Sequence, residues 1–113
     1  MAAGAQLTVT DLRRATRHPV AHTVIGEHRR RGELRLDIVN ISAHGFMTEG
    51  PTTLERGERI VIRLPIAGQI EAHLIWAAGE RAGFQFERII RFEDFMELLD
   101  RLQPNPRLRP TRR

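Results

Sequence analysis

The middle of the chain alternates between apolar and polar residues with a period of two, which is the pattern of β-strands that bury one face. This alternation predicts strands over residues 18–26, 33–41, 46–48, 60–64, 70–76 and 82–86. In the second of them, Leu34, Leu36 and Ile38 are followed by Val39 and Ile41, so the apolar phase changes. A change of phase within one strand predicts a bend or a β-bulge.

Helical spacing appears only near the end of the chain. Apolar residues recur there at intervals of three and four, with charged residues between them: Phe92, Phe95, Met96, Leu99 and Leu102. This spacing predicts an amphipathic helix over 91–102, which Pro104 ends. Five or six short strands followed by one helix predict a mainly β protein, an antiparallel barrel or tightly curled sheet that the helix plugs or flanks.

The length and composition are those of a single globular domain. With 113 residues, of which 41% are hydrophobic and 28% charged, the chain is long enough for one core and too short for a second full domain. We expect a flexible segment over 1–12, one domain over 13–102 with its barrel at about 18–88, and a disordered tail rich in proline and arginine over 103–113.

All 18 basic residues are arginines, and the formal net charge is +4. Four of these arginines lie in the last ten residues, where there is no acidic residue, so the first 103 residues carry 14 arginines and 14 acids. The excess charge therefore belongs to the tail and does not by itself indicate binding to nucleic acid.

Several function classes are excluded or disfavoured by what the sequence lacks. The absence of cysteine excludes disulfides, cysteine-ligated zinc, iron–sulfur clusters and thiol nucleophiles. The first residues do not have the pattern of a signal peptide, and no apolar run approaches the roughly 20 residues of a spanning helix. We therefore expect a cytoplasmic protein without membrane insertion.

Three arginines, Arg13, Arg14 and Arg17, lie within five residues ahead of the first predicted strand. A guanidinium can grip phosphate oxygens bidentately, pair with the O6 and N7 edge of guanine, or lie flat against a base. Taken alone, this cluster is equally well interpreted as a solvated basic arm.

A second group, Asn40, Ser42 and Gly45, forms the pattern N-x-S-x-x-G at a predicted strand end. Asn40 and Ser42 are expected to point the same way, and Gly45 to take a positive φ that leaves its N–H open to a ligand. The pattern alone favours the simpler interpretation of an Asx or serine turn that closes a hairpin.

Together, the two groups resemble the motif pair of the PilZ domain family, which are bacterial receptor domains for cyclic di-GMP. R-x-x-x-R, from Arg13 to Arg17, precedes the first strand, and N-x-S-x-x-G follows some twenty residues later. The last predicted hairpin, with Leu74-Ile75-Trp76 and Gly83-Phe84-Gln85-Phe86, and the final helix are also similar to the family, so the resemblance covers residues 11–102.

This resemblance implies a six-stranded antiparallel barrel with a C-terminal helix, and it implies roles for the matching residues. Arg13 and Arg17 would bind phosphates and guanine edges, with Arg14 helping or stacking between them. Asn40 would bind the Watson–Crick edge of guanine. Ser42 and the backbone of Gly45 would line the pocket.

Two aromatic side chains complete the candidate site. Trp76 stands where the family places an aromatic residue near the ligand, and it continues the apolar phase of Ile70, Ala72 and Leu74. His44 takes the place of a small residue, so it either crowds the pocket or stacks on a base.

Two departures from the family pattern shape what we expect of ligand binding. Asn40 replaces the more common aspartate, and an amide cannot accept two hydrogen bonds from guanine as a carboxylate does, which lowers the expected affinity. Leu12 precedes the first arginine, which leaves one less guanidinium for stacking and favours one ligand per chain.

The alternatives belong to other classes of function. The five histidines, among them His22 and His73, are candidate metal ligands. The absence of cysteine and of carboxylates at ligand spacing disfavours a metal site. Ser42 has no acid–base partner in the sequence, so we expect no catalysis and no cofactor. A small barrel that binds RNA or single-stranded DNA is disfavoured by the 5% aromatic content. A PilZ-fold adaptor without ligand stays open. The favoured function is a cyclic di-GMP receptor that orders residues 1–17 on binding and then contacts a protein partner.

Overall fold

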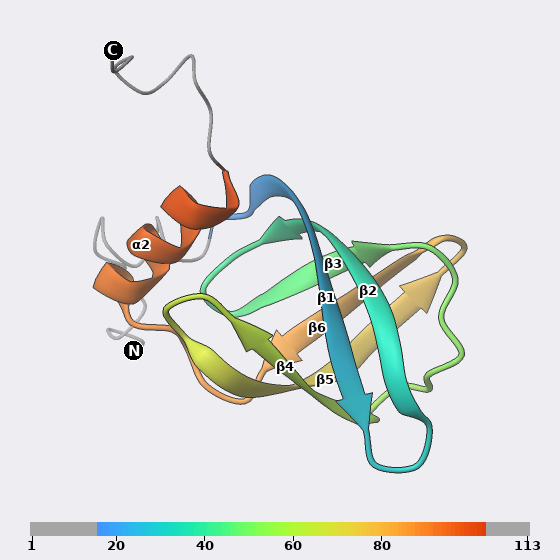
Figure 1. Cartoon of the computed structure of the whole chain (residues 1–113). Helices are drawn as coiled ribbons and strands as arrows, with labels where there is room; N and C mark the ends of the chain where they lie inside the picture. Colours follow the sequence, from blue (N-terminus) through green and yellow to red (C-terminus); the bar gives the residue numbers. More distant parts are fainter. Residues whose placement is uncertain (1–15, 104–113) are drawn as a thin grey trace, which may run out of the picture.

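The computed structural model describes residues 16–103. Its elements are β1 (His18–His28), β2 (Gly32–Ile41), β3 (Gly45–Glu49), β4 (Arg59–Leu64), β5 (Gly68–Ala78), β6 (Arg81–Phe86) and α2 (Phe92–Leu102) (Figure 1). The strands pair antiparallel and close into a barrel in the order β1-β2-β3-β6-β5-β4. The predicted mainly β fold, a six-stranded antiparallel barrel with a C-terminal helix, is confirmed. The expected flexible segment 1–12, and residues 104–113 of the expected tail, lie outside the described residues.

The core fills the inside of this barrel with alternate residues of each strand. On β4, for example, Ile60, Ile62 and Leu64 are buried while the residues between them face outward. The rings of Phe46 and Phe84, which are paired on the neighbouring strands β3 and β6, stack with their centroids 4.9 Å apart. Each large apolar side chain buried in this way contributes about 1.5–3 kcal/mol, so the alternation seen in the sequence is what closes the sheet.

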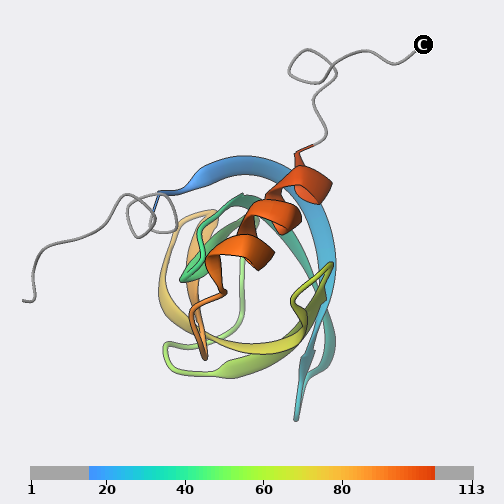
Figure 2. The same ribbon diagram turned by 90° about the vertical axis from the view of Figure 1, so that its left-hand side faces the viewer.

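One end of the barrel is covered by helix α2, which lies across the opening (Figure 2). Four apolar side chains of the helix are buried: Phe95, Leu98, Leu99 and Leu102. At this end the ring of His18 lies 5.7 Å from the ring of Phe95. The side-chain amide of Gln103 also donates a hydrogen bond to the carbonyl oxygen of Pro19. The helix therefore fixes the beginning of β1.

The opposite end of the barrel is held by a buried histidine. Nδ1 of His28 accepts hydrogen bonds from the backbone N–H groups of Arg30 and Arg31, at 3.1 and 3.0 Å. Its other ring nitrogen, Nε2, therefore carries the proton and donates to Glu58 at 2.8 Å. Burial raises the pKa of Glu58, but the His28 hydrogen bond and the charge of Arg31 outweigh it and hold this pKa below its ordinary value. These bonds tie the β1–β2 turn to the segment before β4.

Two β-bulges turn a polar and an aromatic side chain out of the barrel, one in β2 near the helix-covered end and one in β5 toward the opposite end. In β2, the pairing with β3 shifts between Ile38 and Asn40, so Ile41 is buried and Asn40 reaches the surface. In β5, the pairing with β6 shifts between Leu74 and Trp76, so Leu74 is 1% exposed and Trp76 39%. The first bulge was predicted from the change of apolar phase, and the second was not. Bulges commonly re-aim side chains at functional sites in this way.

Candidate functional site

The pairing of β1 with β2 brings the two sequence motifs together. His18 pairs with Ile41 and Pro19 with Asn40, so Arg17 lies directly beside the end of β2. Nη1 of Arg17 donates a hydrogen bond of 2.9 Å to Oδ1 of Asn40, across 23 positions of sequence. One residue from R-x-x-x-R and one from N-x-S-x-x-G thus share a surface at the helix-covered end.

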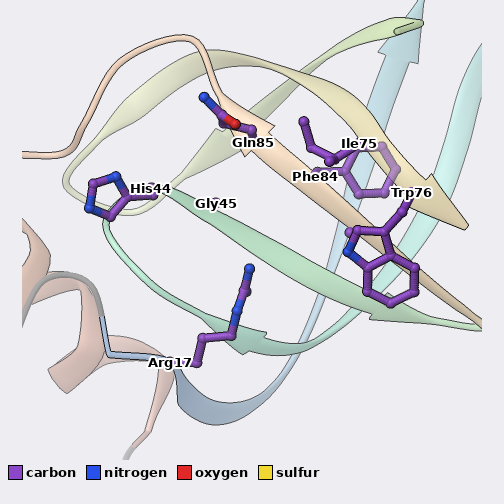
Figure 3. A pocket seen from close by; sticks show the side chains of 8 residues that line it. Arg17, His44, Gly45, Ile75, Trp76, Phe84 and Gln85 are labelled. Carbon is purple, nitrogen blue, oxygen red and sulfur yellow. The ribbon is translucent and has the colours of Figure 1, made fainter. Parts of the chain in front are cut away.

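An open pocket of about 160 Å³ lies next to this pair (Figure 3). It is lined by Arg17, His44, Gly45, Ile75, Trp76, Gly83, Phe84 and Gln85. The guanidinium of Arg17 points toward β3, between the imidazole of His44 and the indole of Trp76. A cation between two flat rings suits a ligand that combines a negative charge with aromatic bases.

Gly45 is required here by close packing and not by a special backbone angle. A Cβ atom built on Gly45 would lie 2.0 Å from the backbone oxygen of Phe84, because β3 and β6 approach closely where Gly45 pairs with Gln85. The positive φ expected for Gly45 is wrong, since its φ lies outside the left-handed region. The glycine therefore lets β3 close against β6 at the floor of the pocket.

The indole of Trp76 is positioned by a glycine that the sequence analysis did not single out. Trp76 pairs with Gly83 across the β5 bulge, and a Cβ atom on Gly83 would lie 2.2 Å from the indole Nε1 and 2.6 Å from Cε2. The ring thus covers the bare backbone of Gly83 beside the pocket. A glycine inside a strand often marks such a close approach, so the position of Gly83 within a predicted strand was the one signal in the sequence for this contact.

Ser42 shapes the turn between β2 and β3 from a buried position. Its hydroxyl accepts a hydrogen bond of 3.1 Å from the backbone N–H of His44, and its own N–H donates to the oxygen of Gly45 at 2.8 Å. This is the serine turn considered from the sequence. Ser42 is not among the residues that line the pocket, whereas His44, which the turn presents, is.

The remaining predicted site residues are Arg13 and Arg14, which lie outside the described residues. Among residues 16–103, no group of three histidine, aspartate or glutamate side chains is arranged to hold a metal ion. His22 on β1 and His73 on β5 are on strands that do not pair, because β4 lies between them. Within the same range, no helix is both long and apolar enough to cross a membrane.

Comparison with known families agrees with this architecture. The family model of the PilZ domain matches residues 11–102, which include both motifs, the whole barrel and the helix. The chain belongs to the PilZ domain family. PilZ domains are receptor domains that bind cyclic di-GMP and are not a catalytic family. No protein with a curated description matches the chain significantly.

Proposed function

We propose that this PilZ domain is a bacterial receptor that binds one molecule of cyclic di-GMP per chain in the pocket beside Arg17. The observation that supports this most is the Arg17–Asn40 hydrogen bond, because it joins the two ligand-binding motifs of the family through Arg17, which lines the pocket. The ligand carries two phosphates and two guanines. A site for this ligand therefore needs cations for the phosphates, polar groups that hydrogen-bond to a base edge, and a flat surface on which a base stacks.

Asn40 is not among the residues that line the pocket, but it is hydrogen-bonded to Arg17, which is. Together, Asn40 and the lining residues offer one group for each of these demands. The Arg17 guanidinium binds a phosphate or the O6 and N7 edge of guanine, and the amide of Asn40 faces a Watson–Crick edge. The Trp76 indole, 39% exposed and backed by Gly83, gives a base a surface for stacking. His44, exposed at the rim, stacks or contacts a phosphate.

The proposed signal runs from the ligand to the segment before β1. Arg13 and Arg14 precede Arg17 by a few residues, so a nucleotide held by all three arginines draws residues 1–17 over the helix-covered end of the barrel. Because α2 fixes the start of β1 through Gln103, this closure changes the surface around the helix. A protein partner then recognises the altered surface.

Isothermal titration calorimetry of the full chain with cyclic di-GMP tests the proposal. Arg17→Ala removes a charge-assisted contact, which is worth about 1.5–3 kcal/mol, so affinity is expected to fall roughly 10- to 150-fold. Arg63→Ala is the matched control, because it removes the same charge from β4, where the side chain bonds to Gln69 away from the pocket.

The same titration separates the alternatives. Saturation at one ligand per chain with the expected Arg17→Ala effect supports the proposal, whereas saturation at two contradicts the single site. No heat with cyclic di-GMP but salt-dependent binding of single-stranded RNA would favour a nucleic-acid-binding barrel. Binding of neither would favour an adaptor that acts through protein contacts alone.

A further inference from the structure

The amide of Asn40 is oriented by its neighbour. A guanidinium has only hydrogen-bond donors, so the 2.9 Å contact with Nη1 of Arg17 fixes Oδ1 of Asn40 on the Arg17 side. The Nδ2 amino group is not engaged by Arg17, and Oδ1 keeps a second lone pair for a ligand. Asn40 therefore presents a donor and an acceptor side by side next to Arg17, which lines the pocket.

Guanine and adenine differ in how their Watson–Crick edges match this pair. Guanine offers the N1–H donor next to the O6 acceptor, and adenine offers the N1 acceptor next to the N6–H donor. An amide pairs with either base, because its oxygen accepts from one position while its amino group donates to the next. A carboxylate has only acceptors, so it pairs with N1–H and N2–H of guanine but faces the lone pair on N1 of adenine.

Neither Trp76 nor Arg17 requires both bases of the ligand to be guanine. Stacking on Trp76 tolerates any base, because every base has an aromatic face. Arg17 can read the O6 and N7 edge of a guanine, and one guanine in the ligand is enough for that contact. The base that faces Asn40 is therefore free to be an adenine.

We propose, resting on the proposed function above, that Asn40 widens the ligand class of this domain to cyclic dinucleotides that combine one guanine with one adenine. Asn40 acts here as the specificity-determining residue of the site. The wild-type chain binds the mixed dinucleotide within about fivefold of cyclic di-GMP. A carboxylate at this position separates the two ligands by roughly 5- to 150-fold, the discrimination typical of one bidentate base contact.

The test is calorimetric titration of the wild-type chain, Asn40→Asp and Gln69→Glu with cyclic di-GMP, the mixed guanine–adenine cyclic dinucleotide and cyclic di-AMP. Asn40→Asp keeps the shape of the side chain and its contact with Arg17. Gln69→Glu adds the same negative charge on β5, where Gln69 bonds to Arg63 outside the pocket. We expect the affinity ratio of the first two ligands to rise in Asn40→Asp and to stay at its wild-type value in Gln69→Glu.

Each outcome bears on one of the two proposals. A wild-type chain that binds cyclic di-GMP but prefers it to the mixed ligand by more than about fivefold overturns this inference and leaves the proposed function intact. An Asn40→Asp ratio equal to that of the wild type also overturns it. A wild-type chain that binds none of the three ligands overturns both. The wild-type ratio decides the matter even if Asn40→Asp does not fold.

Discussion

Replacing Gly83 with alanine tests whether the β6 backbone positions Trp76 for ligand binding. The new Cβ would lie 2.2 Å from the indole Nε1, whereas ordinary contacts begin at 3.4 Å, so the ring must move by about 1.2 Å, the difference between these distances. The backbone itself accepts alanine, because the φ of Gly83 lies outside the left-handed region. The substitution therefore acts on Trp76.

The expected effect follows from the position of the ring. Trp76 is 39% exposed, so the indole can swing outward, and we expect a loss of stability near the lower end of the 1–3 kcal/mol range typical of overpacking. Stacking of a base on an aromatic side chain contributes about 1–3 kcal/mol. If the displaced ring no longer stacks, affinity for cyclic di-GMP falls roughly 5- to 150-fold.

Intrinsic fluorescence measures both effects, because Trp76 is the only tryptophan in the chain. In Gly83→Ala the emission maximum of the free protein is expected to move to longer wavelength, and titration with cyclic di-GMP is expected to show the weaker binding. Gly26→Ala is the matched control, since its Cβ meets only side-chain ends, the nearest being Cδ1 of Leu36 at 3.0 Å. A Gly83→Ala protein with wild-type emission and wild-type affinity would refute the positioning of Trp76 by Gly83.

Two further predictions concern the barrel. Gly45→Ala places a Cβ 2.0 Å from the backbone of Phe84 and must separate β3 from β6, so we expect about 3 kcal/mol less stability and a melting temperature roughly 10–20 °C lower by circular dichroism; a loss as small as that of Gly26→Ala would contradict the close approach. The hydrogen bond from the Thr23 hydroxyl, opposed by burial and aided by the charge of Arg35, holds the pKa of Asp37 below its ordinary value of 3.8. Ionised Asp37 therefore stabilises the fold above pH 3.8, and this contribution is lost as the pH falls through the lowered pKa. In Thr23→Val the Asp37 pKa, followed by NMR, is expected to rise toward 3.8, and an unchanged pKa would rule out the role of the hydroxyl.

The fold could be predicted because most strands of this barrel bury one face, which writes a period of two into the sequence. The bulge in β2 was also visible, since apolar residues occupy both phases at Ile38, Val39 and Ile41. The bulge in β5 could not be predicted, because Trp76 is apolar and stands two residues after Leu74. The apolar alternation therefore continues through Trp76, although the bulge turns its indole outward. Only Gly83, on the partner strand, hinted that the indole lies outside.

The sequence predicts which residues belong to the candidate site better than it predicts how they are arranged. The local pattern identified Asn40, Ser42 and Gly45, but the reason for Gly45 is the oxygen of Phe84, which is 39 positions away in sequence. Likewise, burial of Ser42 depends on the turn that β2 and β3 form together, and not on the alternation of a single strand. Contacts between distant strands set both features, and no local motif contains that information.

The location of the binding site is tested most directly by NMR of the isotopically labelled full chain, with and without cyclic di-GMP. We expect the largest shifts at the backbone amides of Arg17, His44 and Gly45 and at the indole N–H of Trp76, all of which line the pocket. We expect unchanged signals for the amides of Arg30 and Arg31 in the β1–β2 turn, which donate to His28 at the opposite end of the barrel. Shifts centred on that opposite end, or no shifts at a saturating concentration of the nucleotide, would contradict the proposed site.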